Sequence, residues 1–129
     1  MIVLDTNVVS YIFNGDDRAG YYVEQIRGCR AIISFQTLEE LWYGAIAKGW
    51  GERRTEELAD HLEQYEIVWA GPELVETSAR LRSERRVAGR EMSPADAWIA
   101  ATAILLKCPL ASHDGDFLEI PGLALIRSP

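Results

Sequence analysis

The feature of this sequence that most restricts its fold is a regular alternation of short apolar runs with longer segments of helical spacing. The first run, Ile2–Leu4, is continuously apolar, which is typical of a strand buried on both faces. Strands separated by helices pair in parallel, and the helices cover both faces of the sheet. The pattern therefore predicts an α/β fold, a three-layer sandwich around a parallel sheet. The other expected strands are Ala31–Ile33, Ile67–Trp69, Leu110–Ala111 and Leu123–Ile126.

Glycine and proline mark the boundaries of the expected helices. Gly28 and Gly49 follow two helical segments, and glycine commonly stands just past a helix end. Pro72 and Pro94 open two later segments, where the proline ring is compatible with the first helical turn. The expected helices are 8–13, 18–27, 36–48, 52–64, 72–87 and 94–106.

Length and charge limit the class of protein. A chain of 129 residues, 48% of them hydrophobic, forms one ordinary domain over residues 1–129. The net charge of -7 argues against nonspecific coating of nucleic acid, but it is compatible with a nuclease whose acids bind cations. No apolar run reaches the ~18 residues of a membrane span, and no signal peptide is visible. Cys29 and Cys108 are expected to be buried thiols in a reducing, cytoplasmic compartment, without a disulfide.

Acidic residues follow strands or open helices, which are the places where open α/β sheets bind their ligands. Asp5 directly follows the first strand, and its alternative role is the N-cap of the first helix. Glu40 lies near the start of the third helix, where Thr37 and Glu40 also fit a capping box. Asp96 lies in the first turn of an otherwise apolar, buried helix, where an acid is ordinary helix-start chemistry.

Asp114 and Asp116 occupy the polar loop after the fourth expected strand. An ordinary turn also accounts for them, because Asp and Gly are common turn residues. The neighbouring His113 is expected to be a solvated loop residue.

The acids are stronger evidence for a site as a group than one by one, because the strand ends and helix starts that carry them all face one edge of a doubly wound sheet. At ~4 Å and an effective dielectric near 20, each pair of like charges costs roughly 4 kcal/mol, which a divalent cation offsets. Ligand sets made of oxygen alone select magnesium or manganese over zinc. The sequence therefore predicts a Mg²⁺ or Mn²⁺ site.

Motifs in this order and spacing resemble the PIN domain family, specifically the VapC-type toxins of prokaryotic toxin–antitoxin pairs. The resemblance covers nearly the whole chain, and it implies a single PIN domain with a five-stranded parallel sheet. The motifs that carry it are Met1–Asn7, Ser34–Gly44, Asp96–Ala103 and Ser112–Phe117.

The resemblance also implies an activity: a metal-dependent endoribonuclease, usually a homodimer, that a VapB-type antitoxin holds inactive. Its metal would lower the pKa of a water molecule and neutralise charge on the scissile phosphate. Ser112 stands where the family often has threonine, so the hydroxyl is kept. The catalytic acids, carried over by position, are Asp5, Glu40, Asp96 and Asp114, with Asp5, Asp96 and Asp114 on the metal. The supporting residues are Asp116, Asn7, Thr37 and Ser112.

Arginines are concentrated toward the end of the fifth expected helix. They form either a solvated helix face with salt bridges or a strip that contacts RNA phosphates. The candidate RNA-binding residues are Arg80, Arg82, Arg85 and Arg86, with Arg90 nearby.

Other functions are compatible with parts of the sequence. An aspartyl phosphatase could use Asp5, but that chemistry usually needs a second acid where Asn7 stands. A catalytically silent scaffold is disfavoured because every acidic position is retained. A PIN nuclease for RNA processing differs from a toxin in its partner, and a small reading frame upstream would indicate the toxin.

Surplus apolar residues on two helices predict a protein partner. In the third helix Trp42 belongs to an apolar stripe, while Tyr43 and Ile46 lie off it; Phe13 belongs to the crowded first helix. We expect an antitoxin to lay an amphipathic segment between these helices and to insert an arginine among the carboxylates. The alternative is that the apolar excess serves only a homodimer.

Overall fold

The computed structural model describes residues 1–129 and contains one parallel sheet of five strands in the order β3-β2-β1-β4-β5. The predicted α/β fold with a five-stranded parallel sheet is confirmed. The chain begins in the central strand, builds outward to β3, and then crosses back to β4 beside β1. This reversal makes the carboxyl ends of β1 and β4 the switch point of the sheet, where such folds bind ligands. The strands are β1 (Ile2–Leu4), β2 (Ala31–Ser34), β3 (Glu66–Val68), β4 (Leu110–Ala111) and β5 (Leu125–Ile126).

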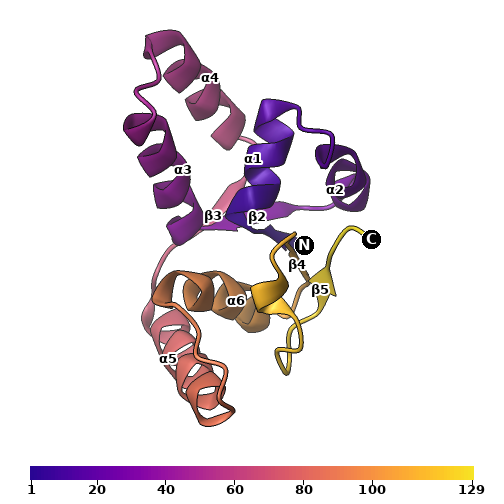
Figure 1. Ribbon diagram of the computed structural model, residues 1–129, viewed down its shortest axis with the longest axis vertical. Helices are drawn as coiled ribbons and strands as arrows, with labels where there is room; N and C mark the ends of the chain where they lie inside the picture. The colour runs from indigo at the N-terminus through magenta and orange to yellow at the C-terminus, as the bar shows by residue number, and fades with distance from the viewer.

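Helices cover both faces of the sheet, and each face has its own hydrophobic core (Figure 1). Ile2 and Leu4 point into the core beneath the first group of helices, while Val3 points into the other core. This alternation explains why the first strand has no polar residue: both of its faces are buried. The first group is α1 (Thr6–Asn14), α2 (Ala19–Ile26), α3 (Phe35–Ala47) and α4 (Glu52–Leu62). The second is α5 (Pro72–Val87) and α6 (Pro94–Leu106).

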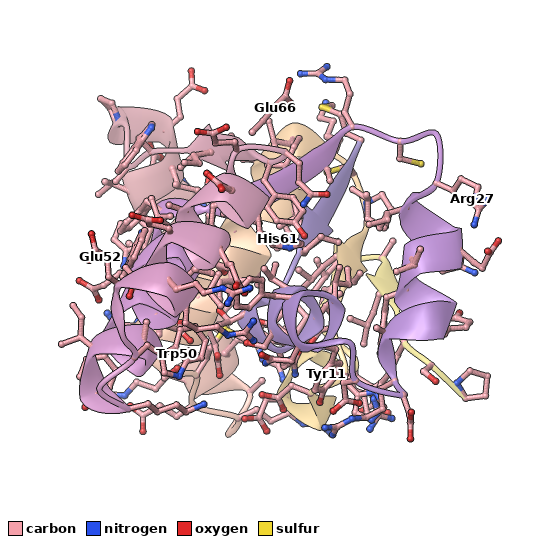
Figure 2. The ribbon with its side chains drawn as sticks, turned by 90° about the horizontal axis from the view of Figure 1, so that it is seen from above. Tyr11, Arg27, Trp50, Glu52, His61 and Glu66 are labelled. Carbon is pink, nitrogen blue, oxygen red and sulfur yellow. The ribbon has the colours of Figure 1, made fainter.

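The helices α3 and α4 form a hairpin that extends away from the sheet beside α1 (Figure 1). Aromatic contacts attach it to α1: the Phe13 ring lies 5.9 Å from that of Trp50 and 5.3 Å from that of His61. Trp50 and His61 are both seen beside α1 in Figure 2. The Arg54 guanidinium lies 4.1 Å from the centre of the Phe13 ring and covers it.

The structure differs from the sequence prediction in a few places. Cys29, in the turn before β2, is exposed and Cys108 is half-buried, so neither is the fully buried thiol that was expected; both are free. Trp69 is 64% exposed, because β3 ends one residue earlier at Val68. The loop after β4 contains a short 3-10 turn, η1 (Gly115–Phe117), which buries the Phe117 ring and fixes the acidic loop to the core. Every helix of the chain is too short or too polar to cross a membrane.

Candidate metal centre

Asp5 stands at the carboxyl end of β1 and is buried, with only 6% of its surface exposed. Its Oδ1 accepts a hydrogen bond from the Thr6 N–H at 2.8 Å, so the residue caps α1. Its Oδ2 accepts from the Ser112 hydroxyl at 2.7 Å, and Ser112 is itself fully buried. The N-cap interpretation of Asp5 is confirmed, and its other oxygen is bound to Ser112 at the end of β4.

Ser112 joins two of the acids. While its hydroxyl donates to Asp5, its Oγ accepts from the Asp114 N–H at 3.0 Å. Asp114 in turn accepts at Oδ1 from the Asp116 N–H at 2.9 Å, so the turn interpretation of this loop is also correct. Asn7 supports the same loop from α1, because its Oδ1 accepts from the His113 N–H at 3.5 Å. These contacts hold Asp5 and Asp114 in a fixed relation.

Asp96 and Glu40 come from helices that start at the same edge of the sheet. Ser93 caps α6 and accepts from the Asp96 N–H at 3.1 Å, which places the half-buried Asp96 in the first turn. Glu40, also half-buried, accepts from the Gln36 side-chain amide at 3.1 Å.

The capping box expected from Thr37 and Glu40 is wrong. Ser34 caps α3 by accepting from the Gln36 N–H, so the helix begins earlier and Thr37 lies inside its first turn. Thr37 is fully buried there, and its hydroxyl accepts from the Thr6 hydroxyl at 3.1 Å, which connects α3 to α1.

Carboxylate oxygens of Asp96, Asp114 and Asp116 lie within 4.8 Å of one another, close enough to share one cation. The sequence placed Asp5 in this set and Asp116 outside it; the structure groups Asp116 with Asp96 and Asp114. Asp116 is exposed, and its direction is set by η1, a turn that the sequence pattern does not predict.

The acids influence one another's ionisation. Burial raises the pKa of Asp5 from 3.8 to about 6, against the lowering effect of its two hydrogen bonds; the charges of Asp96 and Glu40 raise it further. Burial also raises the pKa of Asp96, followed by the nearby charge of Asp114. A metal-free site of this kind resists full ionisation, and cations relieve the repulsion.

His113 is not the solvated loop residue that was expected. Its Nδ1 lies 3.0 Å from the Tyr22 hydroxyl, and its ring meets the Tyr11 ring edge-on at 5.8 Å. The Tyr22 hydroxyl also accepts from the Ser128 N–H at 3.1 Å, which attaches the end of the chain to the acidic loop. Tyr22 could have indicated this contact from the sequence, because a tyrosine on the buried face of a helix needs a hydrogen-bond partner.

The arginines of α5 do not form one strip. Arg80 pairs with Glu76 at 2.7 Å, and Arg82 and Arg86 are exposed. Arg85 is buried, because it continues the inward-facing row of Leu74, Ser78 and Leu81. The helical spacing of that row was readable in the sequence, and it separates Arg85 from the exposed arginines.

Comparisons with known proteins identify the family of this chain. The model of the PIN domain family matches residues 2–123. VapC ribonuclease Y4jK of Sinorhizobium fredii is 31% identical over 98% of this chain and 96% of that protein. Ribonuclease VapC5 of Mycobacterium tuberculosis is 29% identical over 97% of this chain and 91% of its own length.

Solved structures give the same answer at the level of the fold. The VapBC2 complex of Rickettsia felis, bound to a fragment of its promoter DNA, contains a chain that is 28% identical, with a TM-score of 0.86 over 98% of both chains. VapBC-5 of M. tuberculosis matches with 27% identity and a TM-score of 0.74, over 98% of this chain and 97% of that one. By its family match, its relatives and its fold, this chain belongs to the PIN domain family, among the VapC-type proteins.

Proposed function

We propose that this protein is an endoribonuclease that depends on Mg²⁺ or Mn²⁺ and acts as the toxin of a toxin–antitoxin pair. The observation that carries the proposal is the grouping of Asp96, Asp114 and Asp116 at the switch point of the sheet. The names of the two curated relatives, both VapC ribonucleases, support the same chemistry.

The donor set fits a hard divalent cation. The grouped ligands are all carboxylate oxygens, which suit magnesium and manganese, and no cysteine or histidine belongs to the group. Burial raises the pKa of Asp5, and a nearby cation would favour its ionised form. Asp96 and Asp114, with Asp116 or Asp5, would hold the ion.

Each residue then has a task. A bound cation would supply Lewis-acid chemistry, acidifying water and neutralising charge on the phosphate. Glu40, fixed by Gln36, would orient the attacking water by accepting a hydrogen bond from it. Ser112 would keep Asp5 and Asp114 at their positions, and Asn7 would hold the loop that carries Asp114. No side chain is required as a covalent nucleophile.

RNA cleavage by purified protein tests the proposal. Chelation should abolish cleavage, and added Mg²⁺ or Mn²⁺ should restore it; Glu40→Gln should reduce the rate at saturating metal. Glu39→Gln is the matched control, because Glu39 is the adjacent acid on α3 and is exposed. Cleavage by clean protein in excess chelator would exclude the mechanism, as would equal reductions of the rate in the two variants.

We further propose that a VapB-type antitoxin covers the site. The similar VapBC-5 structure of M. tuberculosis belongs to the VapBC family of toxin–antitoxin systems. A small groove between α1, α3 and α4 is lined by Glu40, Phe13 and Trp50, and Lys48 also belongs to its wall. An amphipathic segment with a terminal arginine would match it, because arginine pairs with carboxylates in a bidentate fork.

Antitoxin binding in the groove and self-association as a homodimer would use different residues of the same helices. Tyr43 and Ile46 are 71% and 76% exposed on α3, off the buried stripe that includes Leu41. Phe13→Ala changes the wall of the groove and Trp42→Ala changes the partly buried apolar stripe of α3, so both should weaken antitoxin binding. Tyr43→Ala and Ile46→Ala should affect only self-association. Light scattering and co-purification separate the two. If antitoxin binding is unchanged by Phe13→Ala and Trp42→Ala, the antitoxin does not use this groove. If an antitoxin without basic residues in its tail still inhibits the protein, an inserted arginine is not the inhibitory group.

A further inference from the structure

A pocket of about 550 Å³ adjoins the acid cluster, between the end of α5, the start of α6 and η1. Asp96 and Asp116 belong to its wall, and so do two arginines, Arg85 and Arg90. The pocket therefore brings guanidinium groups next to the proposed cation site. The acids that line it make phosphate entry unfavourable unless these positive charges compensate.

Arg85 has an unusual environment for a buried cation. Only 7% of the residue is exposed, and its one hydrogen bond runs from Nη1 to the Glu119 carbonyl oxygen at 3.2 Å. Its Nε is sealed from solvent and has no acceptor, and no carboxylate lies within ion-pair distance. Leaving a buried charged donor without a partner is costly, so the position calls for an anion.

The unsatisfied side of Arg85 is the one that binds anions in pairs. Nε and Nη2 form one edge of the guanidinium, and in Arg18 this edge donates to both oxygens of Asp16 at 2.9 Å each. In Arg85 neither atom donates to a protein group, and Nη2 is not sealed from solvent. Nε stays covered by protein, so a phosphate in the pocket would contact Arg85 through Nη2, and the charge of the whole guanidinium would favour it there.

Arg90 is a second positively charged side chain in the pocket, and it is paired with Glu119. Its Nη1 donates to the Glu119 carboxylate at 2.6 Å, and its backbone N–H donates to the Arg85 carbonyl oxygen at 2.8 Å. Glu119 thus contacts both arginines, one through its backbone and one through its side chain. Because the Arg90–Glu119 pair is on the surface, a phosphate competes with the carboxylate at little cost.

We propose that Arg85 and Arg90 bind a phosphate of the RNA strand next to the phosphate that is cut. The inference rests on the proposed ribonuclease function: a strand whose scissile phosphate lies at Asp96 and Asp116 carries further phosphates on both sides, and the pocket adjoins those acids. Arg85 is then a substrate-positioning residue that fixes the strand relative to the acids. Its structural alternative is merely to hold the Glu119 carbonyl.

Binding of a fluorescent single-stranded RNA oligonucleotide of mixed sequence, in Ca²⁺ and with its integrity checked on a gel, tests the proposal. Log affinity falls linearly with log salt, and each RNA phosphate that the protein neutralises contributes about 0.7 to that slope. Arg85→Gln should therefore make the slope shallower and reduce affinity on the order of tenfold. Arg90→Gln should act in the same direction. Glu119→Gln should raise affinity, because it releases Arg90.

The control is Arg27→Gln. Arg27 forms a comparable surface pair with Glu24 at 2.7 Å, but it lies at the outer edge of α2 and points away from the molecule (Figure 2). Its replacement should leave the slope and the affinity unchanged. If Arg85→Gln does not fold, Arg85→Lys and Arg90→Gln decide. Lysine keeps the charge and so the slope, but its ammonium does not reproduce the planar guanidinium that presents Nη2 to the pocket, so it should bind RNA more weakly.

The outcomes separate this inference from the proposed function. Wild-type protein that cleaves RNA, with unchanged slopes in the Arg85 and Arg90 variants, would overturn the phosphate site and leave the nuclease standing. A lower melting temperature of Arg85→Gln with an unchanged slope would assign it the structural role. Wild-type protein that neither binds nor cleaves RNA would overturn both.

Discussion

Replacing Asp5 by asparagine should make the metal-free protein more stable. The change keeps the shape of the side chain and both of its structural contacts. The amide oxygen still accepts from the Thr6 N–H, and asparagine is as good an N-cap as aspartate. The amide nitrogen can donate to Ser112 Oγ in place of the hydrogen bond that Asp5 now accepts. What the change removes is a buried negative charge beside Asp96 and Glu40.

The magnitude follows from the pKa. Burial raises the pKa of Asp5 from 3.8 to about 6 in the folded protein. The folded state therefore binds more protons than the unfolded chain between these values, so wild-type stability falls as pH rises through this window. Two pKa units correspond to about 3 kcal/mol, which is the cost of the ionised group at pH 7. At roughly 4 °C per kcal/mol, Asp5→Asn should melt on the order of 10 °C higher at pH 7 in chelator.

Urea unfolding of both proteins in chelator, at a series of pH values, tests this reasoning. The advantage of Asp5→Asn should be absent near pH 3.5, grow through the window, and level off above pH 6. A variant that is less stable than wild type at pH 7 would show that the contacts of the carboxylate outweigh its desolvation. An advantage of the same size at pH 3.5 would refute its assignment to ionisation.

Two other substitutions test how the site is held in place. Ser112→Ala leaves a buried Asp5 oxygen and the Asp114 N–H without partners. It should therefore lower the free energy of unfolding by about 1–3 kcal/mol and reduce RNA cleavage. Unchanged stability in urea unfolding would refute the bridging role of Ser112. Tyr22→Phe removes the hydroxyl that binds His113 and the Ser128 N–H. It should lower the free energy of unfolding by about 1 kcal/mol and speed hydrogen exchange at Ser128 and in the acidic loop. Exchange at the wild-type rate would argue against the link between the end of the chain and the loop.

Much of this architecture was readable from the sequence, because local chemistry and tertiary packing agree. The continuous apolar run at Ile2–Leu4 is the central strand, buried on both faces. Ser93 and Pro94 open α6 where capping rules place its start, which puts Asp96 in the first turn. The convergence of acids at one edge follows from parallel strands whose connecting helices start at that edge.

Two of the features that were missed depend on the conformation of a single turn, which periodicity does not fix, and a third was visible in the helical spacing. Ser34 caps α3 in place of Thr37, because β2 runs directly into the helix. The 3-10 turn after β4 aims Asp116 at Asp96, and only the buried Phe117 ring hints at it. Arg85 was grouped with its exposed neighbours by composition, although its spacing from Leu81 places it on the inward face.

The most direct test of the central claim is calorimetric titration of Mn²⁺ into the apo protein at pH 7. Asp96 is the acid that the grouped carboxylates and the raised pKa both identify. Wild type and Glu39→Gln should bind Mn²⁺ saturably, and Asp96→Asn should abolish that binding while the variant remains folded. Undiminished binding by folded Asp96→Asn, or no binding by wild type, would contradict a metal centre at this edge of the sheet.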